Sequence, residues 1–400
     1  MNKIITTFAI LITLLFSYNI TNASSEQKIS LDNKTVVKGY TIVSNDKLLS
    51  IAVKPNAFAG ATIFTVNKSE VNEKTINNQK IKSALYSVSF NNKPKTPLLI
   101  KINWQSFSNL PKNVYWRGYN QNQWQQLPTK IVDKQAIAEI IDSGDLIVLE
   151  QTATNINDIT KHVSAKSFAV IDAGSGKVLL TKNGNQVRSI ASLTKLMTAM
   201  IYLERPVAWQ TKTNITKEDK DIPVTIGLKD NEEVDVKSLW FATLTKSAND
   251  AAKALARISG LNKNDFVKRM NSWAKELDLK NTSFSDPSGL DKNNKSTAIE
   301  VATLARAAFT YPDIVEATGT KELTINTNQN RNLILKNSTT LFDSDLKIIA
   351  AKTGYTTEAG RCQIIKADGE KRSVIVVVLG SGFGKHTTDA YDLASWFTNN

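Results

Sequence analysis

Residues 167–204 read SFAVIDAGSGKVLLTKNGNQVRSIASLTKLMTAMIYLE. Two apolar runs flank the turn-forming sequence Ala-Gly-Ser-Gly at 173–176, and this pattern predicts a hairpin of two strands over 167–180. From residue 192 to 204 the apolar residues recur every three or four positions, which is the period of a helix. The stretch therefore predicts a strand hairpin followed by a helix that begins at Ser192.

The sequence after this stretch is first helical and then returns to strands. Apolar faces with helical spacing are present over residues 236–245, 249–258, 263–277 and 297–310. Strands are predicted at 347–352, 360–367 and 373–379, and a closing helix at 388–397. A helical block framed by strands predicts one α/β sheet assembled from the first and last segments of this part of the chain.

The chain before residue 150 has a different pattern. Short alternating runs are separated by Asn, Lys, Asp and Pro, at residues 48–53, 61–66, 84–90, 97–104, 113–119, 124–129 and 145–149. Such spacing indicates an all-β sandwich. Residues 151–161 are polar and lack an apolar period, which predicts a linker. Since 400 residues are enough for two cores, we expect a β domain at 24–150 and a second domain at 162–400.

Residues 1–23 have the features of a secretory signal. Lys3 supplies a positive charge, residues 4–16 form an apolar core, and Thr21-Asn22-Ala23 supplies small residues for cleavage. A retained membrane anchor is the alternative, although the apolar stretch is shorter than about 18 residues. We therefore expect an exported protein, periplasmic or extracellular and associated with the cell wall. No basic amphipathic tail precedes residue 400, so no C-terminal membrane helix is expected.

Charge and rare residue types limit the function classes. The net charge of +13 favours a polyanion, which could be nucleic acid, anionic lipid or an anionic cell-wall polymer. The basic residues are scattered and form no recognisable nucleic-acid module, so we expect no nucleic acid. Cys362 is the only cysteine, and His162 and His386 are the only histidines. An intramolecular disulfide is therefore excluded, and a Cys/His zinc site and a Ser-His-Asp triad are both disfavoured.

Ser192 and Lys195 are three residues apart, so a helix that starts at Ser192 places the hydroxyl and the amine on one face. A serine hydroxyl becomes a good nucleophile when a base removes its proton, and a lysine can be that base if burial lowers its pKa. Backbone N–H groups at the helix start favour negative charge at the same point. Because lysine is abundant here, this pair alone is also typical of a solvated helix face.

Two further motifs have structural alternatives of their own. Ser247-Ala248-Asn249 lies between two predicted helices, where Ser and Asn are common helix caps. Lys352-Thr353-Gly354 ends a predicted strand, where glycine commonly marks the end. The functional interpretation is that the strand presents Lys and Thr to a substrate carboxylate, while Gly354 lets the substrate backbone approach closely.

The order Ser-x-x-Lys, Ser-x-Asn, Lys-Thr-Gly, each in a suitable element, is far more specific than any one motif. Over 162–400 the chain resembles the serine D-alanyl-D-alanine carboxypeptidases (peptidase S11, low-molecular-weight penicillin-binding proteins). The flanking sequences agree at 169–180 (AVIDAGSGKVLL), 191–198 (ASLTKLMT), 247–252 (SANDAA), 281–290 (NTSFSDPSGL), 296–298 (STA) and 351–362 (AKTGYTTEAGRC). The resemblance implies an α/β (α+β) fold of the β-lactamase/transpeptidase type, an antiparallel sheet with a helical cluster, preceded here by the all-β sandwich.

The resemblance also implies a role for each motif residue. Ser192 would attack the penultimate D-Ala carbonyl and form an acyl-enzyme, with Lys195 accepting its proton. Ser247 and Lys352 would relay a proton to the leaving D-Ala. Asn249 would bind the acyl side of the substrate, Thr353 with Lys352 would bind the terminal carboxylate, and Gly354 would face the substrate backbone. The oxyanion would lie between the backbone N–H groups of Ser192 and Tyr355. Peptidoglycan stem peptides would be substrates and β-lactams acylating inhibitors, with no metal or organic cofactor.

The sequence also departs from the family pattern. Many members carry a Gly-Arg-Glu type sequence after the last strand, whose arginine assists carboxylate binding, whereas residues 381–386 here read SGFGKH. Lys385 or His386 could take over this task, although a surface position is the more common role of such residues. The family also commonly places its catalytic domain first, whereas here the β domain comes first. Its role is open between a spacer and a glycan-binding or partner-binding module.

Two other functions stay open. A class A β-lactamase shares the three motifs but needs a carboxylate that activates a deacylating water, and Glu276, Glu300 and Glu316 lie in no motif for that role. A non-catalytic wall-binding protein would keep the fold without needing Lys195 or Lys352. The intact motifs favour an enzyme, namely a D-alanyl-D-alanine carboxypeptidase or endopeptidase.

Overall fold

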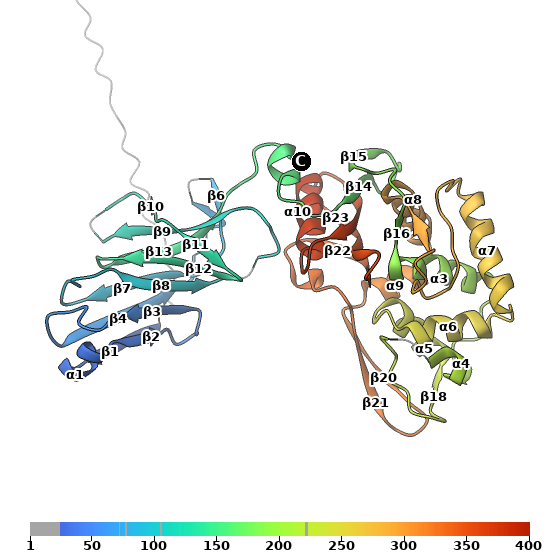
Figure 1. Cartoon of the computed structure of the whole chain (residues 1–400), viewed down its shortest axis with the longest axis horizontal. Coiled ribbons are helices and arrows are strands. Elements are labelled where there is room, and N and C mark those ends of the chain that lie inside the picture. Colours follow the sequence, from blue (N-terminus) through green and yellow to red (C-terminus); the bar gives the residue numbers. More distant parts are fainter. Residues whose placement is uncertain (1–24, 72, 77, 105, 120, 221–222) are drawn as a thin grey trace, which may run out of the picture. The chain divides into compact units, whose positions relative to one another are not determined.

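The computed structural model describes residues 25–400 apart from 72, 77, 105, 120, 221 and 222. The expected signal segment, residues 1–23, lies outside the described residues. The described part of the chain divides into two compact units (Figure 1): unit 1 comprises the described residues before 105 together with 110–152, and unit 2 comprises the described residues of 106–109 and 153–400. Each unit has a hydrophobic core of its own.

Unit 1 is a sandwich of two antiparallel sheets. The larger sheet has the strand order β1-β4-β7-β13-β6-β5, with β9 beside β13 and β10 beside β9, and the other has the order β11-β12-β8-β3-β2. Alternate residues of both sheets enter the core, as Leu98, Ile100 and Ile102 of β8 do, because side chains alternate across a strand. The elements are β1 (Ser25–Leu31), α1 (Asn33–Lys38), β2 (Tyr40–Val43), β3 (Leu49–Val53), β4 (Thr62–Ser69), β5 (Thr75–Ile76), β6 (Gln79–Ile81), β7 (Leu85–Phe90), β8 (Leu98–Asn103), β9 (Lys112–Gly118), β10 (Gln125–Gln126), β11 (Lys130–Val132), β12 (Gln135–Ile140) and β13 (Gly144–Glu150).

Unit 2 combines one central sheet with helices. Its elements are α2 (Ile156–Thr160), β14 (Ser167–Asp172), β15 (Val178–Lys182), β16 (Arg188–Ser189), η1 (Ala191–Thr194), α3 (Lys195–Glu204), β17 (Lys212–Asn214), α4 (Lys217–Lys220), β18 (Glu233–Asp235), α5 (Val236–Leu244), α6 (Asn249–Ile258), α7 (Lys263–Glu276), β19 (Lys295–Ser296), α8 (Ala298–Ala308), α9 (Pro312–Gly319), β20 (Glu322–Asn326), β21 (Asn332–Lys336), η2 (Leu341–Asp343), β22 (Lys347–Thr356), β23 (Gly360–Asp368), β24 (Ser373–Ser381) and α10 (His386–Asn399).

The predicted sheet of unit 2 is confirmed. Its five strands have the antiparallel order β15-β14-β24-β23-β22, so the first segments of the unit pair with the last. α10 packs against β23 and β24 on one face, and α8 packs against β14 and β24 on the other (Figure 1). Because both faces are covered, β24 is almost entirely buried and lacks the polar alternation of a half-exposed strand. The α+β fold class predicted from the sequence is therefore correct.

Some elements differ from the prediction. The expected linker at 151–161 contains the short helix α2, whose start is held by Asn155 and Asp158 in a reciprocal capping arrangement. A polar five-residue helix has no apolar period, so the pattern missed it. The hairpin β20–β21 was also not predicted. Its strands each bury one residue fully, Ile325 and Leu335, which leaves a weak signal.

Candidate active site

Ser192 lies in the 3-10 turn η1, and Lys195 is the first residue of α3. The predicted single helix from Ser192 is therefore a 3-10 turn that continues into an α-helix, and both side chains still meet. Ala191, directly before Ser192, has a φ of 47°, a left-handed conformation that costs about 1–3 kcal/mol for such a residue. Strain of this kind persists where the surroundings hold it in place, and it is concentrated at functional sites.

Lys195 has three polar partners and is fully buried. Its Nζ lies 2.8 Å from Ser192 Oγ, 2.6 Å from Asn249 Oδ1 and 2.6 Å from the backbone oxygen of Ser288. A neutral amine has two N–H bonds and one lone pair. If the N–H bonds donate to the Asn249 and Ser288 oxygens, which can only accept, the lone pair points to the Ser192 hydroxyl. The geometry thus orients Lys195 as a base for Ser192.

Burial also supplies the protonation state that a base needs. Removal from water lowers the pKa of Lys195 from 10.5 to about 7, while the negative charges of Asp286 and Asp250 oppose part of this decrease. A substantial fraction of the amine is therefore neutral near pH 7, as a general base requires.

A second Ser–Lys pair adjoins the first. Lys352 Nζ lies 2.7 Å from Ser247 Oγ and 3.1 Å from the backbone oxygen of Thr353, and its side chain is fully buried. Burial, followed by repulsion from the charge of Lys195, lowers the pKa of Lys352 well below 10.5. Two buried amines that disfavour each other's protonation can pass a proton between serines at modest cost.

The helix-cap alternative for Ser247-Ala248-Asn249 does not match the structure. The cap of α6 is Ala248, which has no side-chain cap bond. Ser247 lies before it with a φ of 67°, and its hydroxyl meets Lys352. The Asn249 amide accepts from Lys195 and donates to the backbone oxygen of Pro223. Both polar residues of the motif are therefore used inside the site.

Strand β22 brings the Lys-Thr-Gly motif directly beside the nucleophile. A Cβ atom on Gly354 would lie 3.0 Å from Ser192 N and 3.1 Å from Ala191 Cβ, which is closer than ordinary contacts. The missing side chain therefore lets the strand pass against the backbone N–H of Ser192. Thr353 Oγ1 lies 2.6 Å from Ser338 Oγ, and Tyr355 is 59% exposed. The oxyanion role of the Ser192 and Tyr355 N–H groups stays a prediction.

Arg361 on β23 is a site residue that the sequence reasoning did not single out. In the β22–β23 register Thr353 faces Gln363 and Tyr355 faces Arg361, which makes Arg361 a diagonal neighbour of Thr353 on the same face. Its guanidinium lies 5.0 Å from the Tyr355 ring and 4.9 Å from the Phe383 ring. Among the described residues its Nε has no hydrogen-bond partner. A cation is thus held beside Thr353 by aromatic rings.

Lys385 and His386 lie at the start of α10. Lys385 Nζ donates to Asn109 Oδ1 at 3.0 Å. Burial and, less strongly, the charge of Arg361 lower the pKa of His386 to about 4, so its imidazole is neutral at pH 7. A neutral imidazole offers no net charge to a carboxylate, and Arg361 is the better placed cation.

Sequence reasoning did not identify Ser288 as a partner of Lys195, whose amine donates to the Ser288 backbone oxygen. It belongs to a loop in which the Asp286 carboxylate accepts from the N–H groups of Ser288 and Gly289 at 3.2 and 3.0 Å. Gly289 has a φ of 86°, and a Cβ atom there would lie 2.1 Å from the Ala191 oxygen. Asp-Pro-Ser-Gly is a recognisable turn signal. That this turn meets a lysine 93 residues earlier is a tertiary fact.

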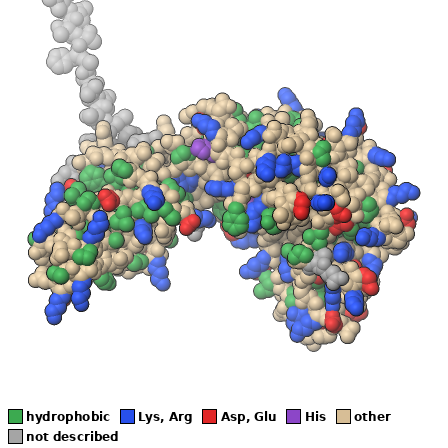
Figure 2. Space-filling model, in the orientation of Figure 1, with side chains coloured by type: hydrophobic (Ala, Val, Ile, Leu, Met, Phe, Trp, Pro, Cys, Tyr) green, Lys and Arg blue, Asp and Glu red, His purple; other side chains and the backbone are tan. Residues whose placement is uncertain are grey.

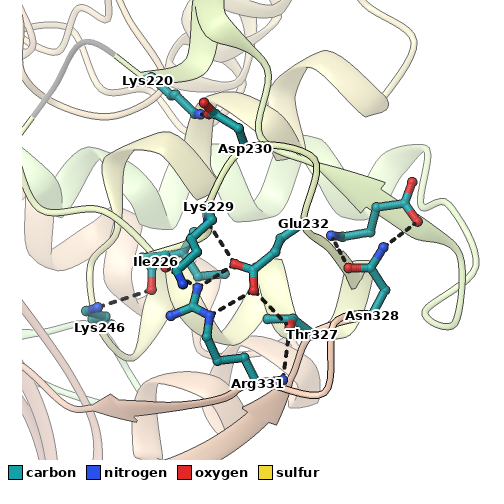
Figure 3. A network of polar contacts seen from close by, with 11 residues as sticks. Lys220, Ile226, Lys229, Asp230, Glu232, Lys246, Thr327, Asn328 and Arg331 are labelled. Carbon is teal, nitrogen blue, oxygen red and sulfur yellow. Dashed lines mark hydrogen bonds and ion pairs between the residues drawn. The ribbon is translucent and has the colours of Figure 1, made fainter.

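A network of polar contacts supports the loop before α6 (Figure 3). The buried carboxylate of Glu232 accepts from Arg331 Nε at 2.8 Å, from Thr327 Oγ1 at 3.2 Å and from the backbone N–H of Lys229 at 2.7 Å. The N–H of Ile226 donates to Asp250 of α6 at 2.9 Å. The hairpin β20–β21 is thus tied through Arg331 to the loop that carries Pro223, the acceptor for Asn249.

The three glutamates considered for a β-lactamase are occupied elsewhere. Glu276 lies 2.6 Å from Arg269, and Glu316 lies 3.8 Å from Lys237. Glu300 accepts from the Asn281 N–H at 2.9 Å. The structure therefore gives no support to any of these three as the carboxylate that activates a deacylating water.

Neither unit offers, among its described residues, a metal-ligand cluster or a helix that could cross a membrane. Within the described residues no group of three or more His, Cys, Asp or Glu is placed to hold a metal ion. In the same part of the chain, no helix combines the length and the apolar character that crossing a membrane requires.

Comparison with known proteins gives consistent results. The family model for D-alanyl-D-alanine carboxypeptidase matches residues 151–382. The chain is 34% identical over 227 residues to the D-alanyl-D-alanine carboxypeptidase DacF of Bacillus subtilis, which covers 55% of this chain and 58% of that protein. It is 31% identical over 252 residues to the D-alanyl-D-alanine endopeptidase of Escherichia coli, which covers 62% of this chain and 81% of that protein.

Solved structures agree. The crystal structure of the Streptomyces K15 DD-transpeptidase matches with a TM-score of 0.55 and 27% identity over 58% of this chain and 97% of that chain. The family match spans more than half of the 400 residues and contains all three motifs around Ser192. The chain therefore belongs to the D-alanyl-D-alanine carboxypeptidase family of serine peptidases.

Proposed function

We propose that this protein is an exported serine peptidase that cleaves D-alanyl-D-alanine bonds, or the corresponding D,D cross-links, of peptidoglycan peptides through an acyl-enzyme on Ser192. One observation carries the proposal. The fully buried Lys195 amine lies 2.8 Å from Ser192 Oγ, while Asn249 and Ser288 supply acceptors for its other hydrogens. Relatives named as carboxypeptidases and endopeptidases support the substrate class.

The acylation step uses the two Ser–Lys pairs in turn. Neutral Lys195 takes the Ser192 Oγ proton as Oγ bonds to the carbonyl carbon of the penultimate D-Ala. The carbonyl oxygen becomes an oxyanion, to which the N–H groups of Ser192 and Tyr355 donate. The C–N bond then breaks, and the proton that Lys195 took passes through Lys352 and Ser247 to the leaving amine, which leaves Lys195 neutral again. Water attacks the acyl carbon, gives its proton to Lys195, and Ser192 leaves as a protonated hydroxyl.

Acylation by a fluorescent penicillin tests the nucleophile. We expect the wild-type protein to be labelled and Ser192→Ala to be unlabelled, because the Ser192 hydroxyl is the nucleophile 2.8 Å from the Lys195 amine, whereas the Asn249 and Ser288 oxygens near that amine carry no proton to give up. Ser175→Ala is the matched control, since Ser175 lies in an exposed turn and bonds Asp172. Failure of the wild-type protein to become labelled would contradict the proposal. Slow release of the label supports a peptidase, and rapid release a β-lactamase.

We further propose that Arg361 takes the place of the missing family arginine and, with Thr353, binds the terminal carboxylate. The support is its position diagonal to Thr353 and its guanidinium beside two exposed rings, Tyr355 and Phe383. Arginine is well suited to carboxylates because its fork of N–H groups can donate twice.

Substitution of Arg361 tests this anchor, because loss of a carboxylate contact should change substrate binding (KM) more than the chemical step (kcat). Arg361→Gln should raise KM for a D-Ala-D-Ala peptide by about tenfold or more with kcat less affected, since a charge-assisted hydrogen bond contributes about 1.5–3 kcal/mol. The peptide with an amidated C-terminus should lose this dependence. Lys385→Gln is the matched control. Equal KM values for Arg361→Gln and wild type would reject the anchor.

Analysis of the reaction products distinguishes a carboxypeptidase, which removes the terminal D-Ala, from an endopeptidase, which cleaves cross-links. A pentapeptide and a cross-linked muropeptide offered side by side would release D-Ala or separate the two stems, respectively. Relatives of both kinds match at similar identity, so we propose the shared bond type and leave the ratio to this measurement.

Location and charge complete the proposal. The signal-like segment at 1–23 supports export to the compartment that holds peptidoglycan. Figure 2 shows Lys and Arg side chains spread over the visible face of each unit, in keeping with the net charge of +13. This positive charge supports a weak attraction to an anionic wall polymer. Raised ionic strength should remove that attraction, because salt screens exposed charges.

A further inference from the structure

Unit 1 has an open cavity of about 420 Å³ at one end of its larger sheet. It lies where β7 and β9 end and where β13 begins. The side chains that matter for the argument are Phe90, Lys93, Trp116, Tyr119, Gln121 and Asp142. The residues that line the cavity precede residue 151, so the cavity lies outside the family match.

The cavity contains a built aromatic platform. Gly118 of β9 and Gly144 of β13 are paired directly across the two strands. A Cβ atom on Gly144 would lie 2.5 Å from Trp116 Nε1, and one on Gly118 would lie 3.1 Å from Trp116 Cη2. The indole therefore lies across the glycine pair, at the place where two side chains would otherwise stand. The ring is half-buried and also packs against the core of unit 1, so only part of its surface lines the cavity.

A second aromatic ring argues against a purely structural role. An aromatic ring over glycines stabilises a sheet by covering exposed backbone, so Trp116 alone does not identify a ligand. Tyr119, however, is 53% exposed and lies at the same cavity. Phe90 also lines the cavity, but it packs against the core beside Phe58 and Phe64, so Tyr119 is the ring that is open to solvent there. Exposed aromatic surface beside polar groups is characteristic of ligand sites.

The rim of the cavity is polar but carries no net charge. Lys93 Nζ and Asp142 Oδ1 form an ion pair at 2.9 Å, and Gln121 adds an amide. Paired charges do not select an anion or a cation. They and the amide instead offer donors and acceptors in several directions, which suits a ligand with many hydroxyl groups.

We propose that this cavity binds a neutral sugar chain, with the Trp116 ring stacked on the C–H face of a pyranose. The apolar face of a pyranose matches an aromatic ring, and its equatorial hydroxyls reach outward to Gln121 and the Lys93–Asp142 pair. This inference is independent of the reaction at Ser192. It gives the β-sandwich the task of holding the protein on a polysaccharide while unit 2 acts.

Calorimetric titration of the full chain carrying Ser192→Ala tests the proposal, with a tetramer of N-acetylglucosamine and a neutral glucose tetramer as the two probes. We expect saturable binding of at least one of them. Tyr119→Ala should raise Kd by about tenfold, because the variant loses one aromatic contact with the sugar and the apolar area that this contact buries. Binding of the acetylated probe alone assigns the source to wall-type glycan, and equal binding of both assigns it to neutral polysaccharide in general.

The controls separate this site from folding and from catalysis. Tyr40→Ala is the matched variant, because Tyr40 is 48% exposed on the other sheet, and it should bind like the parent. Trp116→Ala should bind still more weakly. If Trp116→Ala fails to fold, the Tyr119→Ala variant remains the test of the site. With Ser192 intact, Tyr119→Ala should be acylated by penicillin at the wild-type rate. Absence of binding to both probes, or equal Kd values for Tyr119→Ala and Tyr40→Ala, would overturn the proposal. So would binding of dextran sulfate alone.

Discussion

Lys195 and Lys352 are both fully buried in unit 2, and burial changes what each amine can do. In water a lysine is a cation and cannot accept a proton. Within the site, loss of hydration lowers the pKa of each, and the serine hydroxyls of Ser192 and Ser247 lie 2.8 and 2.7 Å away. Motif spacing predicted the Ser192–Lys195 pair, whereas the Ser247–Lys352 pair was expected from the family resemblance. The degree of burial, on which the chemistry depends, could not be read from spacing.

The pH dependence of acylation follows from the lowered pKa of Lys195. Its pKa falls from 10.5 to about 7, so the amine is protonated and inactive below that value and neutral above it. The rate of penicillin acylation should therefore rise roughly tenfold per pH unit below 7 and level off above it. Stopped-flow labelling from pH 5 to 9 measures this.

Two variants control the pH profile. Lys195→Ala should lose about 10²–10⁴-fold in acylation rate above pH 7 and should lack the tenfold rise per pH unit below it, because the general base is gone. Lys268→Arg, on the exposed face of α7, should keep the wild-type profile. A rate that continues to climb to pH 10 would mean that Lys195 titrates like an exposed lysine, and the assignment of the base would be wrong.

At the scale of elements, the site depends on loops between helices and strands. α5 and α6 were predicted from their apolar period, and α6 begins and ends as expected at residues 249 and 258. The hairpin β20–β21 was not predicted, yet Arg331 at its turn reaches the buried Glu232. Contacts between residues about 100 positions apart leave no periodic trace in a sequence.

The Glu232–Arg331 pair should give a characteristic loss of stability in acid. Hydrogen bonding to Arg331 lowers the pKa of Glu232 from 4.5 to about 2. A depressed carboxyl pKa stabilises the fold at pH values above 4.5, and this contribution disappears as pH falls toward about 2. The difference in unfolding free energy between wild type and Glu232→Gln should thus be constant from pH 7 to 5 and shrink below that. Urea unfolding at each pH provides the measurement.

Glu322→Gln serves as the control for this acid effect. Glu322 pairs with Lys336 at 3.3 Å, but the two side chains are 50% and 72% exposed. An exposed pair contributes little, so this variant should follow wild type at every pH. Identical curves for Glu232→Gln and Glu322→Gln would show that burial of Glu232 adds nothing.

At the scale of the whole molecule, two separate cores hold the two units. The prediction of an all-β part followed by an α+β part came from a change of hydrophobic period near residue 150. Separate cores should unfold separately, so calorimetry should show two transitions. Penicillin, whose proposed target Ser192 lies in unit 2, should shift one of them alone.

A core substitution in unit 1 identifies the other transition. Phe64 is fully buried against Phe58 and Phe90. Phe64→Ala should destabilise unit 1 by about 3–5 kcal/mol through lost burial and a cavity. The transition that penicillin leaves in place should move to lower temperature, while the acylation rate at Ser192 stays at the wild-type value. A single transition that responds to both changes would contradict independent cores.

The sequence by itself predicted the fold class, the change of architecture near residue 150 and the motif residues Ser192, Lys195, Ser247, Asn249 and Lys352. The architecture follows from local periods, which are properties of neighbouring residues, and the motif residues follow from short spacings together with the order of the three motifs and the family resemblance. Tertiary structure alone decided that the Ser288 carbonyl meets Lys195 and that Arg361 lies diagonal to Thr353. It also decided that Trp116 lies over two glycines. Each is a contact between distant segments, created when strands pair and loops close, and no local pattern specifies such a contact.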